Sequence, residues 1–535
     1  MKTIENVVIV GGGSAGWMSA ATFAKFYPSC KITVIESPNI PTVGVGESTL
    51  GQIRNWLYAL DIKEEDFLKE VDGSYKLGIK FTDFYKKDSG SFYYPFGNPF
   101  VTPDTPNNLN TWHVKKVMYP STPADDYCKT WYSTIPLMDN NKFTPNLDFE
   151  LPGYRSDVNL AYHFDAVKFA TWLRNIYCIP RGVWYIQAEV TEVTVFEEGI
   201  ESLTLDNGKT ISADLFIDCT GFKSLLLNKH LNEPFNSLEH ILPNNKAWAT
   251  QIPYTDRDKE MEPYTNCTAI GNGWVWNIPV WSRIGTGYVY SDKFITPEKA
   301  LEEFKEYLTS DKMTVVDRDR VKDLVFKELS FTPGIHRRIW VKNVVAIGLS
   351  AGFIEPLESN GLYTTHEFLL KLMKSLTRLT VTQWDRDVFN YAALDMFNNF
   401  AEFVALHYAL TNRTDTEYWR DITEKSFNGE LGQIVKKETF ADGFFKLAEK
   451  KMFSQEFVGG GMHCIATGMN YPVVDPVAIA AWELHYDKDL KKRVDLFISE
   501  REVVQREWNK IAIKSPTLHQ YLKDKYHSDE VSHDI

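Results

Sequence analysis

Three residues of this sequence have side chains and settings suited to chemistry. Lys76 lies in the nearly apolar stretch 73–79, where burial would lower the pKa of an ammonium group and leave a neutral amine. Glu355 and Glu358 lie on either side of a Pro-Leu pair, and a carboxylate there could accept a proton or stabilise a cationic intermediate. The residues alone leave plainer alternatives open: Lys76 as a surface lysine, Lys80 in its place, or either glutamate as a helix cap.

The first 36 residues predict an element that would hold a dinucleotide. The apolar run Val7–Val10 suits a buried parallel strand, residues 17–26 are helix-like, and a second strand at 31–35 ends at Glu36. The letters GGGSAG between strand and helix fit GxGxxG, whose glycines let a pyrophosphate approach the backbone and the helix N-terminus. Glu36 is then placed to bond a ribose hydroxyl. The contacts predicted here are Gly11, Gly13, Ser14, Ala15, Gly16 and Glu36.

Two later segments extend this sheet and favour FAD over NAD. Ala213–Gly221 and Asn343–Ser350 are apolar strands that end in small-residue turns. Strands spread so widely along a chain are typical of flavoproteins with an extended FAD. No second glycine fingerprint for NAD follows, so we expect the reductant to come from another protein. The predicted fold class is α/β: an FAD-binding Rossmann-like box of the glutathione-reductase type with a mainly α-helical C-terminal part.

Tryptophan is unusually concentrated in GWVWNIP at 273–279. In a strand, Trp274, Trp276 and Ile278 would point to one face and make a broad, rigid apolar surface. Such a surface could line a flavin cavity and keep water from a reactive oxidant. It could also be part of a large aromatic core.

The elements fall into two predicted parts. Residues 1–365 would form the FAD-binding box, with an insertion at about 82–153 that is rich in proline, asparagine and aromatic residues. Residues 366–535 would form a helical part that completes the substrate pocket.

The helical part has a regular apolar pattern. Apolar residues recur every three or four positions from Phe389 to Val404, and His407 continues the same face. We therefore expect His407 to be a hydrogen-bonded core histidine and not a ligand. Trp482 and Trp508 are expected to be packing anchors near the C-terminus.

Composition argues against several classes of function. The net charge of -13, without a basic stripe, argues against a nucleic-acid partner. No apolar run is long enough to span a membrane, and the N-terminus enters a strand without the apolar core of a signal peptide. The six cysteines lack metal-like spacing, so we expect no metal site, buried free thiols and a cytoplasmic location.

A series of motifs carries a family resemblance. They are GGGSAGW at 11–17, IPTVGVGEST at 40–49, GSYKLGIKF at 73–81, FYYPFGN at 92–98, YHFDA at 162–166, DCTG at 218–221, GWVWNIP at 273–279, GFIEPLESNG at 352–361 and HYALTNRTDTEYW at 407–419. With these motifs the sequence resembles the flavin-dependent tryptophan halogenases, from residue 5 to about 420 and more loosely to about 475. WxWxIP is the most specific of them.

The resemblance implies an activity and the residues behind it. In that family FADH2, O2 and halide make hypohalous acid. A lysine matched here by Lys76 captures this acid as a haloamine or holds it by a hydrogen bond, and Glu358 matches the second catalytic position. The tryptophan wall lies beside the flavin and keeps organic substrate away from it. The wall and tunnel residues expected here are Trp274, Trp276, Ile278, Pro279 and Ser359.

The resemblance also completes the cofactor and halide sites. A strap over the flavin matches residues 40–51. The further flavin contacts expected are Val45, Gly46, Val190 and Gly348. Halide would bind the backbone N–H groups of Asn360 and Gly361, although many members have threonine where this chain has Asn360. That departure could reshape the halide pocket.

The substrate pocket departs from the tryptophan-specific pattern. Phe96 matches a stacking residue of the family. Tryptophan-specific members hold the amino acid with paired tyrosines and a glutamate, and the positions that match them here are Phe445, Lys446 and Met452. Phe457 replaces an indole-stacking tryptophan. We therefore expect an electron-rich aromatic other than free tryptophan, with bromide or iodide favoured over chloride.

This interpretation requires one partner and leaves two rival functions. The partner is a separate NAD(P)H-dependent flavin reductase, and homo-oligomerisation is left open. One rival is an FAD monooxygenase that hydroxylates its aromatic substrate directly, and WxWxIP argues against it. The other is a flavin-binding protein without catalysis, and the presence of both Lys76 and Glu358 argues against it.

Overall fold

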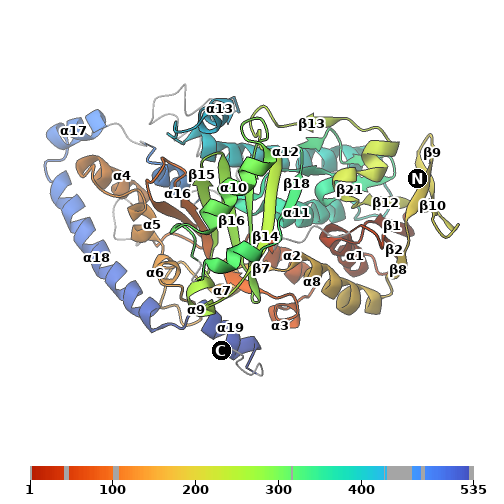
Figure 1. The fold of residues 1–535 in the computed structure, drawn as a ribbon, viewed down its shortest axis with the longest axis horizontal. Helices are drawn as coiled ribbons and strands as arrows, with labels where there is room; N and C mark the ends of the chain where they lie inside the picture. The colour runs from red at the N-terminus through yellow and green to blue at the C-terminus, as the bar shows by residue number, and fades with distance from the viewer. Residues whose placement is uncertain are drawn as a thin grey trace.

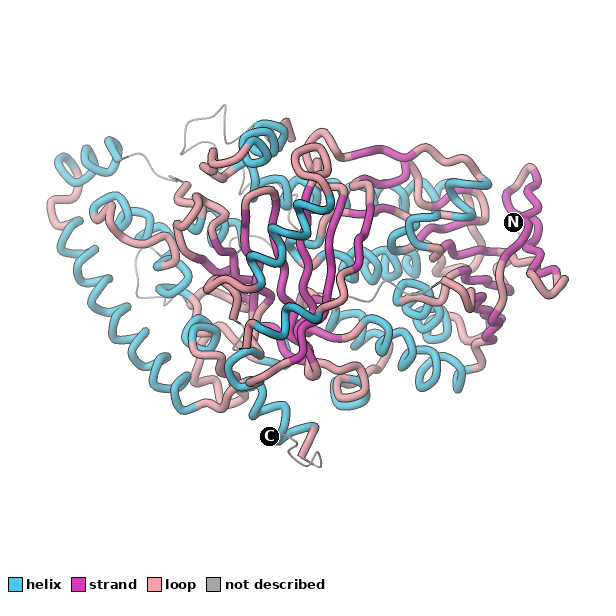
Figure 2. The backbone as a smooth tube through the Cα atoms, in the orientation of Figure 1, coloured by secondary structure: helices cyan, strands magenta, loops and turns pink. Residues whose placement is uncertain are grey.

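The computed structural model describes residues 3–40, 47–100, 108–314, 317–426, 428–429, 461–471 and 476–528. Two large sheets lie side by side and helices cover them (Figure 1). The same layout is visible in the backbone trace of Figure 2, where the strands of the central sheet lie next to one another. The molecule is therefore α/β, with its C-terminal elements helical, and the predicted fold class is confirmed.

The first sheet has the strand order β20-β21-β12-β1-β2-β8. Its strands are β1 (Asn6–Val10), β2 (Lys31–Glu36), β8 (Trp184–Gln187), β12 (Leu215–Asp218), β20 (Trp340–Val341) and β21 (Val344–Ala346). All neighbouring pairs are parallel except β20 and β21. Helix α1 (Ser14–Phe26) follows β1 at once and begins three residues before the predicted start. The predicted strand–glycine turn–helix–strand unit is thus present.

The second sheet contains the tryptophan-rich strand. Its order is β18-β14-β17-β16-β15-β5-β6, and helix α10 (Pro297–Leu308) crosses in front of it in Figure 1. The strands are β5 (Gly78–Thr82), β6 (Ser91–Pro95), β14 (Lys246–Pro253), β15 (Thr265–Ile270), β16 (Gly273–Pro279), β17 (Arg283–Tyr290) and β18 (Lys327–Ser330). Every residue of β16 is buried, so both faces of this strand are covered.

A small sheet carries Lys76. It consists of β3 (Glu47–Ser48), β7 (Ala161–Phe164) and β4 (Ser74–Lys76), with β7 in the middle. Two more sheets have three strands each. One contains β9 (Val190–Phe196), β10 (Gly199–Leu205) and β11 (Thr210–Ile211). The other contains β13 (Phe235–Ser237), β19 (Gly334–His336) and β22 (Gly352–Phe353).

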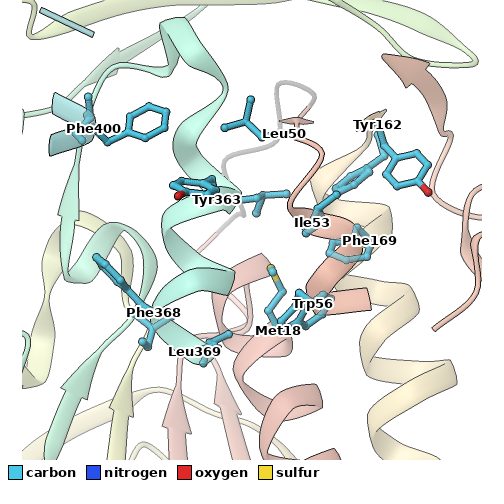
Figure 3. Close-up of a cluster of buried hydrophobic side chains, with 14 of the residues drawn as sticks. Met18, Leu50, Ile53, Trp56, Tyr162, Phe169, Tyr363, Phe368, Leu369 and Phe400 are labelled. Carbon is cyan, nitrogen blue, oxygen red and sulfur yellow. The ribbon is translucent and has the colours of Figure 1, made fainter. Parts of the chain in front are cut away.

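Large apolar side chains join the first sheet to its helices. In Figure 3, Met18 of α1, Trp56 of α2 (Ile53–Ala59), Phe169 of α8 (Ala166–Trp172) and Leu369 of α11 (Asn360–Ser375) lie in one buried cluster. Each fully buried side chain of this size contributes about 1.5–3 kcal/mol of hydrophobic free energy. This packing holds α11 in the core, and the first residues of the same helix form part of the site below.

The remaining helices are spread over both predicted parts of the chain. They include α3 (Glu64–Phe67), α4 (Asn108–Met118), α5 (Asp126–Trp131), α6 (Ile135–Asp139), α7 (Ser156–Asn159), α9 (Arg257–Glu260), α12 (Gln383–Ala409), α13 (Glu417–Ser426), α16 (Gly461–Gly468), α17 (Pro476–His485), α18 (Leu490–Lys514) and α19 (Leu518–Tyr526). One hydrophobic core runs from β1 to α19, so the division at residue 365 stays a prediction. None of the described helices combines the length and apolarity needed to cross a bilayer.

One of the two predicted packing anchors is wrong. Trp508 is buried on α18, as expected. Trp482, however, is 54% exposed. It lies on α17, at the outer edge of the molecule in Figure 1, and its ring lies 5.3 Å from that of Tyr486, just after the helix. Composition could not distinguish an inner from an outer helix face here.

Candidate active site

A cleft at the carboxyl ends of the first sheet has the features of a dinucleotide site. It extends from Glu36 along the glycine turn to Asn360 and Gly361 at the start of α11. Gly11 has φ +114°, and a Cβ on it would lie 2.1 Å from the carbonyl oxygen of Cys219. A Cβ on Gly16 would lie 1.8 Å from the carbonyl oxygen of Gly11. Only glycine fits at these two positions, so the turn is built for a close approach to its backbone.

The start of α1 is open to an anionic ligand. Gly13 is its N-cap, and no described side chain caps the first N–H groups, which face the cleft. Ser14, Ala15, Val190 and Gly348 line the same cleft. The residues present therefore fit FAD, with its pyrophosphate at the glycine turn. The predicted strap contacts Val45 and Gly46 lie outside the described residues.

Lys76 is fully buried at the end of β4. Its Nζ donates to Ser359 Oγ at 2.7 Å and to the Thr49 carbonyl oxygen at 3.0 Å, and it lies 5.1 Å from the centre of the Phe96 ring. Burial lowers the pKa of Lys76 to about 7, although the charge of Glu358 acts in the opposite direction. The amine is thus present in both protonation states near neutral pH. Its sequence rival, Lys80, is only partly buried.

Glu358 is hydrogen-bonded to a histidine that the sequence did not connect to it. Its Oε1 lies 2.7 Å from His407 Nε2, and His407 Nδ1 lies 2.9 Å from the Phe403 carbonyl oxygen. Nδ1 must carry a proton to donate to that carbonyl. Nε2 therefore either accepts a proton from a neutral Glu358 or donates one to its carboxylate. Both side chains are fully buried.

The two oxygens of Glu358 differ in their hydrogen bonding. Within the described part of the chain, Glu358 Oε2 is buried and has no hydrogen-bond partner. Leaving such an atom unpaired costs free energy, so it is a natural acceptor for a bound ligand. His407 was expected to be a satisfied core histidine, and it is buried. Only the fold shows that the partner is Glu358, because the two residues are 49 positions apart.

Glu355 has a different set of partners. Its Oε2 accepts hydrogen bonds from Asn244 Nδ2 at 2.6 Å and from Trp274 Nε1 at 3.3 Å. Burial raises the pKa of Glu355, and these donors oppose that rise. Glu355 therefore holds the first indole of the tryptophan strand, whereas Glu358 faces His407.

The tryptophan strand packs beneath the turn that carries both glutamates. The rings of Trp274 and Trp276 lie 6.1 Å apart at 57°. Trp276 pairs with Gly287 across β16 and β17, and a Cβ on Gly287 would lie 2.2 Å from the indole. At the end of the strand, Pro279 accepts a hydrogen bond from Ser74 of β4 at 2.5 Å. The wall thus touches the strand of Lys76 directly.

The start of α11 joins the two halves of the site. Ser359, with φ +59°, is its N-cap, but its hydroxyl accepts from Lys76 and donates to Ser48 Oγ at 3.0 Å. No described side chain caps the first N–H groups of α11, so the helix presents an anion-binding end to the cleft. Asn360 and Gly361 line that end. Their predicted role in halide binding is consistent with this position and stays a prediction.

A second cavity, of about 1010 Å³, borders the site. Phe96 lines it and also lies over Lys76. The predicted substrate residues Met452 and Phe457, together with Phe445 and Lys446, lie outside the described residues. Sequence reasoning missed three charged residues of this cavity, Arg54, Glu64 and Lys525, because they come from distant and otherwise ordinary helices.

Comparisons with known proteins agree with this site. A family model described as tryptophan halogenase matches residues 6–472. Tryptophan 6-halogenase ThaL of Streptomyces albogriseolus is 32% identical over 90% of this chain and 92% of its own length. Tryptophan 7-halogenase RebH of Lentzea aerocolonigenes is 34% identical over 78% of each chain.

Solved structures give the same result. The apo structure of VirX1 matches with a TM-score of 0.87 and 36% identity, covering 98% of this chain and 100% of the other. Tar14, a tryptophan C-6 flavin-dependent halogenase (chlorinase) from taromycin biosynthesis, matches with a TM-score of 0.82 and 30% identity, covering 97% and 99%. The chain therefore belongs to the tryptophan halogenase family and is a flavin-dependent halogenase.

Proposed function

We propose that this halogenase acts on an electron-rich aromatic other than free tryptophan, with Lys76 and Glu358 as its catalytic residues. The observation that carries the assignment is the fully buried Lys76, whose pKa lies near 7, beside a glutamate with an unpartnered oxygen. A neutral amine there can take up electrophilic halogen, and Glu358 Oε2 can accept the proton that the arene loses. His407 holds the other oxygen of Glu358 in place.

The cofactor cleft would hold reduced FAD between the glycine turn and the start of α11. When bound, the flavin supplies the oxidation of halide by O2. The chain's own residues would then do three things. The amides of Asn360 and Gly361 would bind the halide, the walls of Trp274 and Trp276 would exclude water and organic substrate, and Lys76 would receive the hypohalous acid.

The function is tested directly by incubating the protein with reduced FAD, bromide and a panel of indoles, phenols and anilines. Mass spectrometry is expected to find singly brominated products with the paired bromine isotopes. Products that contain added oxygen, and form equally without halide, would instead identify a monooxygenase.

Hydride must be supplied by a second protein. NADH with this chain and FAD alone is expected to give no product, because the cleft offers a single glycine fingerprint and that one fits FAD. Adding a flavin reductase is expected to start halogenation. The measurement is product formation together with NADH absorbance. Direct NADH oxidation by this chain would contradict the prediction.

Free tryptophan is expected to be a poor substrate. An ammonium group buried without a partner is costly, and Met452 stands where tryptophan-specific members have a glutamate. Lys446 could meet a carboxylate, so acidic and neutral aromatics should be better substrates. Methionine and phenylalanine linings adapt to varied shapes, which favours a permissive pocket.

The measurement is a competition between equimolar tryptophan and a neutral indole with bromide, analysed by mass spectrometry. The neutral indole is expected to be brominated preferentially. Repeating the reaction with chloride and iodide is expected to rank chloride last, because it is the hardest of the three halides to oxidise. Preference for tryptophan at a single ring position would overturn the substrate argument and leave the halogenase assignment intact.

A further inference from the structure

The cavity beside the proposed active site has a charged end that the halogenation chemistry does not use. Arg54 of α2, Glu64 of α3 and Lys525 of α19 all line it, at a distance along the chain from Lys76 and Glu358. Helix α19 lies beyond residue 472, where the match to the family model ends.

Glu64 is the centre of this charged end. It accepts hydrogen bonds from Tyr75 at 2.5 Å, Tyr162 at 2.8 Å, Tyr526 at 3.0 Å and Lys525 at 3.1 Å. Burial alone would raise the pKa of Glu64, but the hydrogen bonds from the tyrosines and the charge of Lys525 hold it below its usual value. Glu64 is therefore ionised at neutral pH.

Two cations share this one carboxylate. Lys525 Nζ lies 3.1 Å from Glu64 Oε1, and Arg54 Nη1 lies 3.5 Å from Glu64 Oε2. The group of three carries one net positive charge. The other charged residues that line the cavity are Lys63, Glu65 and Asp157, and Asp157 is paired with Arg155. The lining as a whole therefore holds three cations and three carboxylates, and the positive excess is local to the end formed by Arg54, Glu64 and Lys525.

The charged end is firmly built. Leu518 and Leu522 bury one side of α19, and His527, just after the helix, stacks on Trp281 with ring centres 3.8 Å apart. On the cavity side, the Tyr521 ring lies 4.7 Å from Phe143 and 5.9 Å from Tyr75. The packing of α19 thus fixes the position of Lys525 at the edge of the cavity, unlike that of a free surface lysine.

The cavity extends from this end to Phe96, the ring that lies over the reactive amine. Tyr75 and Lys76 are neighbours in β4 and point to opposite faces, as successive strand residues do. Phe96 bridges the two faces, because its ring lines the cavity and lies 5.1 Å from Lys76 Nζ. At about 1010 Å³ the cavity is at the upper end of the range for small-molecule sites. An arene at Phe96 therefore leaves room for a substituent that reaches toward Arg54 and Lys525.

We infer that Arg54 and Lys525 form a subsite for an anionic substituent, and that the substrate is an aromatic bearing a carboxylate or similar anion on a side chain. This inference rests on the proposed function, because it concerns the substrate of the same cavity. It adds a place for the anion, on helices that the sequence motifs do not reach. The rings of Tyr75, Phe143 and Tyr521 would flank the apolar part of the side chain.

The test compares two probes of equal length, 3-(indol-3-yl)propanoate and 3-(indol-3-yl)propan-1-ol, with reduced FAD and bromide. The quantity measured is the ratio of kcat/KM for the acid to that for the alcohol. Lys525→Met removes the excess charge and is expected to lower this ratio about tenfold. Glu64→Gln adds one positive charge and is expected to raise it.

Opposite changes in the ratio separate charge recognition from structural damage, which would lower kcat/KM for both probes alike. Lys523→Met is the matched control, since Lys523 is on the same helix but does not line the cavity, and it should keep the wild-type ratio. A ratio that falls in both Lys525→Met and Glu64→Gln, or changes in neither, overturns the inference. If the wild type halogenates neither probe, both the proposed function and this subsite are contradicted. If it halogenates both probes but the ratio is the same in all variants, only the subsite is wrong.

Discussion

Lys76→Ala is expected to lower aromatic halogenation by at least about a hundredfold, the low end for loss of a positioned catalytic group. Among the described residues Lys80 is no substitute for the buried amine, because it is partly exposed and lies near the rings of Tyr93 and Tyr264. FAD binding and O2 consumption should persist in the variant, since both precede the step at Lys76. The measurements are brominated product and O2 uptake from the same reaction.

Lys80→Ala is the matched control and should halogenate like the wild type. If Lys80→Ala fails and Lys76→Ala does not, the assignment of the lysine is wrong. The pH dependence adds a second test. Because burial lowers the pKa of Lys76 to about 7, its neutral fraction grows as pH rises through that value. Halogen transfer through a neutral amine should therefore increase from pH 6 to 8, whereas a role for the ammonium as a hydrogen-bond donor predicts a decrease.

Glu358→Gln is expected to reduce halogenation by about a hundredfold while the protein stays folded. An amide has nearly the same shape but cannot accept the arene proton or carry the charge. It can still hydrogen-bond to His407, so the packing of α12 against the turn should survive. Product formation is the first measurement, and circular dichroism checks the fold.

His407→Gln tests whether the hydrogen bond between His407 and Glu358 contributes to catalysis. It is expected to cost less than Glu358→Gln, because the carboxylate remains, but to slow proton removal from the arene. A substrate deuterated at the reacting ring position would then show a larger kinetic isotope effect in this variant than in the wild type. A purely structural role for His407 would lower the rate and leave the isotope effect unchanged. If Glu358→Gln halogenates at the wild-type rate, the assignment of Glu358 is wrong and Glu355 becomes the candidate catalytic carboxylate.

The sequence by itself determined the elements whose cause is local. The β-branched run before Gly11, the glycine spacing and the acid at Glu36 predicted a dinucleotide turn, and the structure has β1, α1 and β2 in those places. A turn that only glycine can adopt is a property of a few adjacent residues, as the 2.1 Å approach of a Gly11 Cβ to Cys219 illustrates. The motifs likewise sufficed to predict the family.

Only the tertiary structure decided which polar residues act together. Lys76 and Lys80 have similar neighbours along the chain, yet β4 buries one and β5 leaves the other partly exposed. Glu355 and Glu358 are separated by two residues, but the first holds Trp274 and the second His407. No motif or spacing in the sequence predicted that Glu64 would lie beside Arg54 and Lys525. Burial and hydrogen-bond partners depend on contacts between distant segments, and no local spacing encodes them.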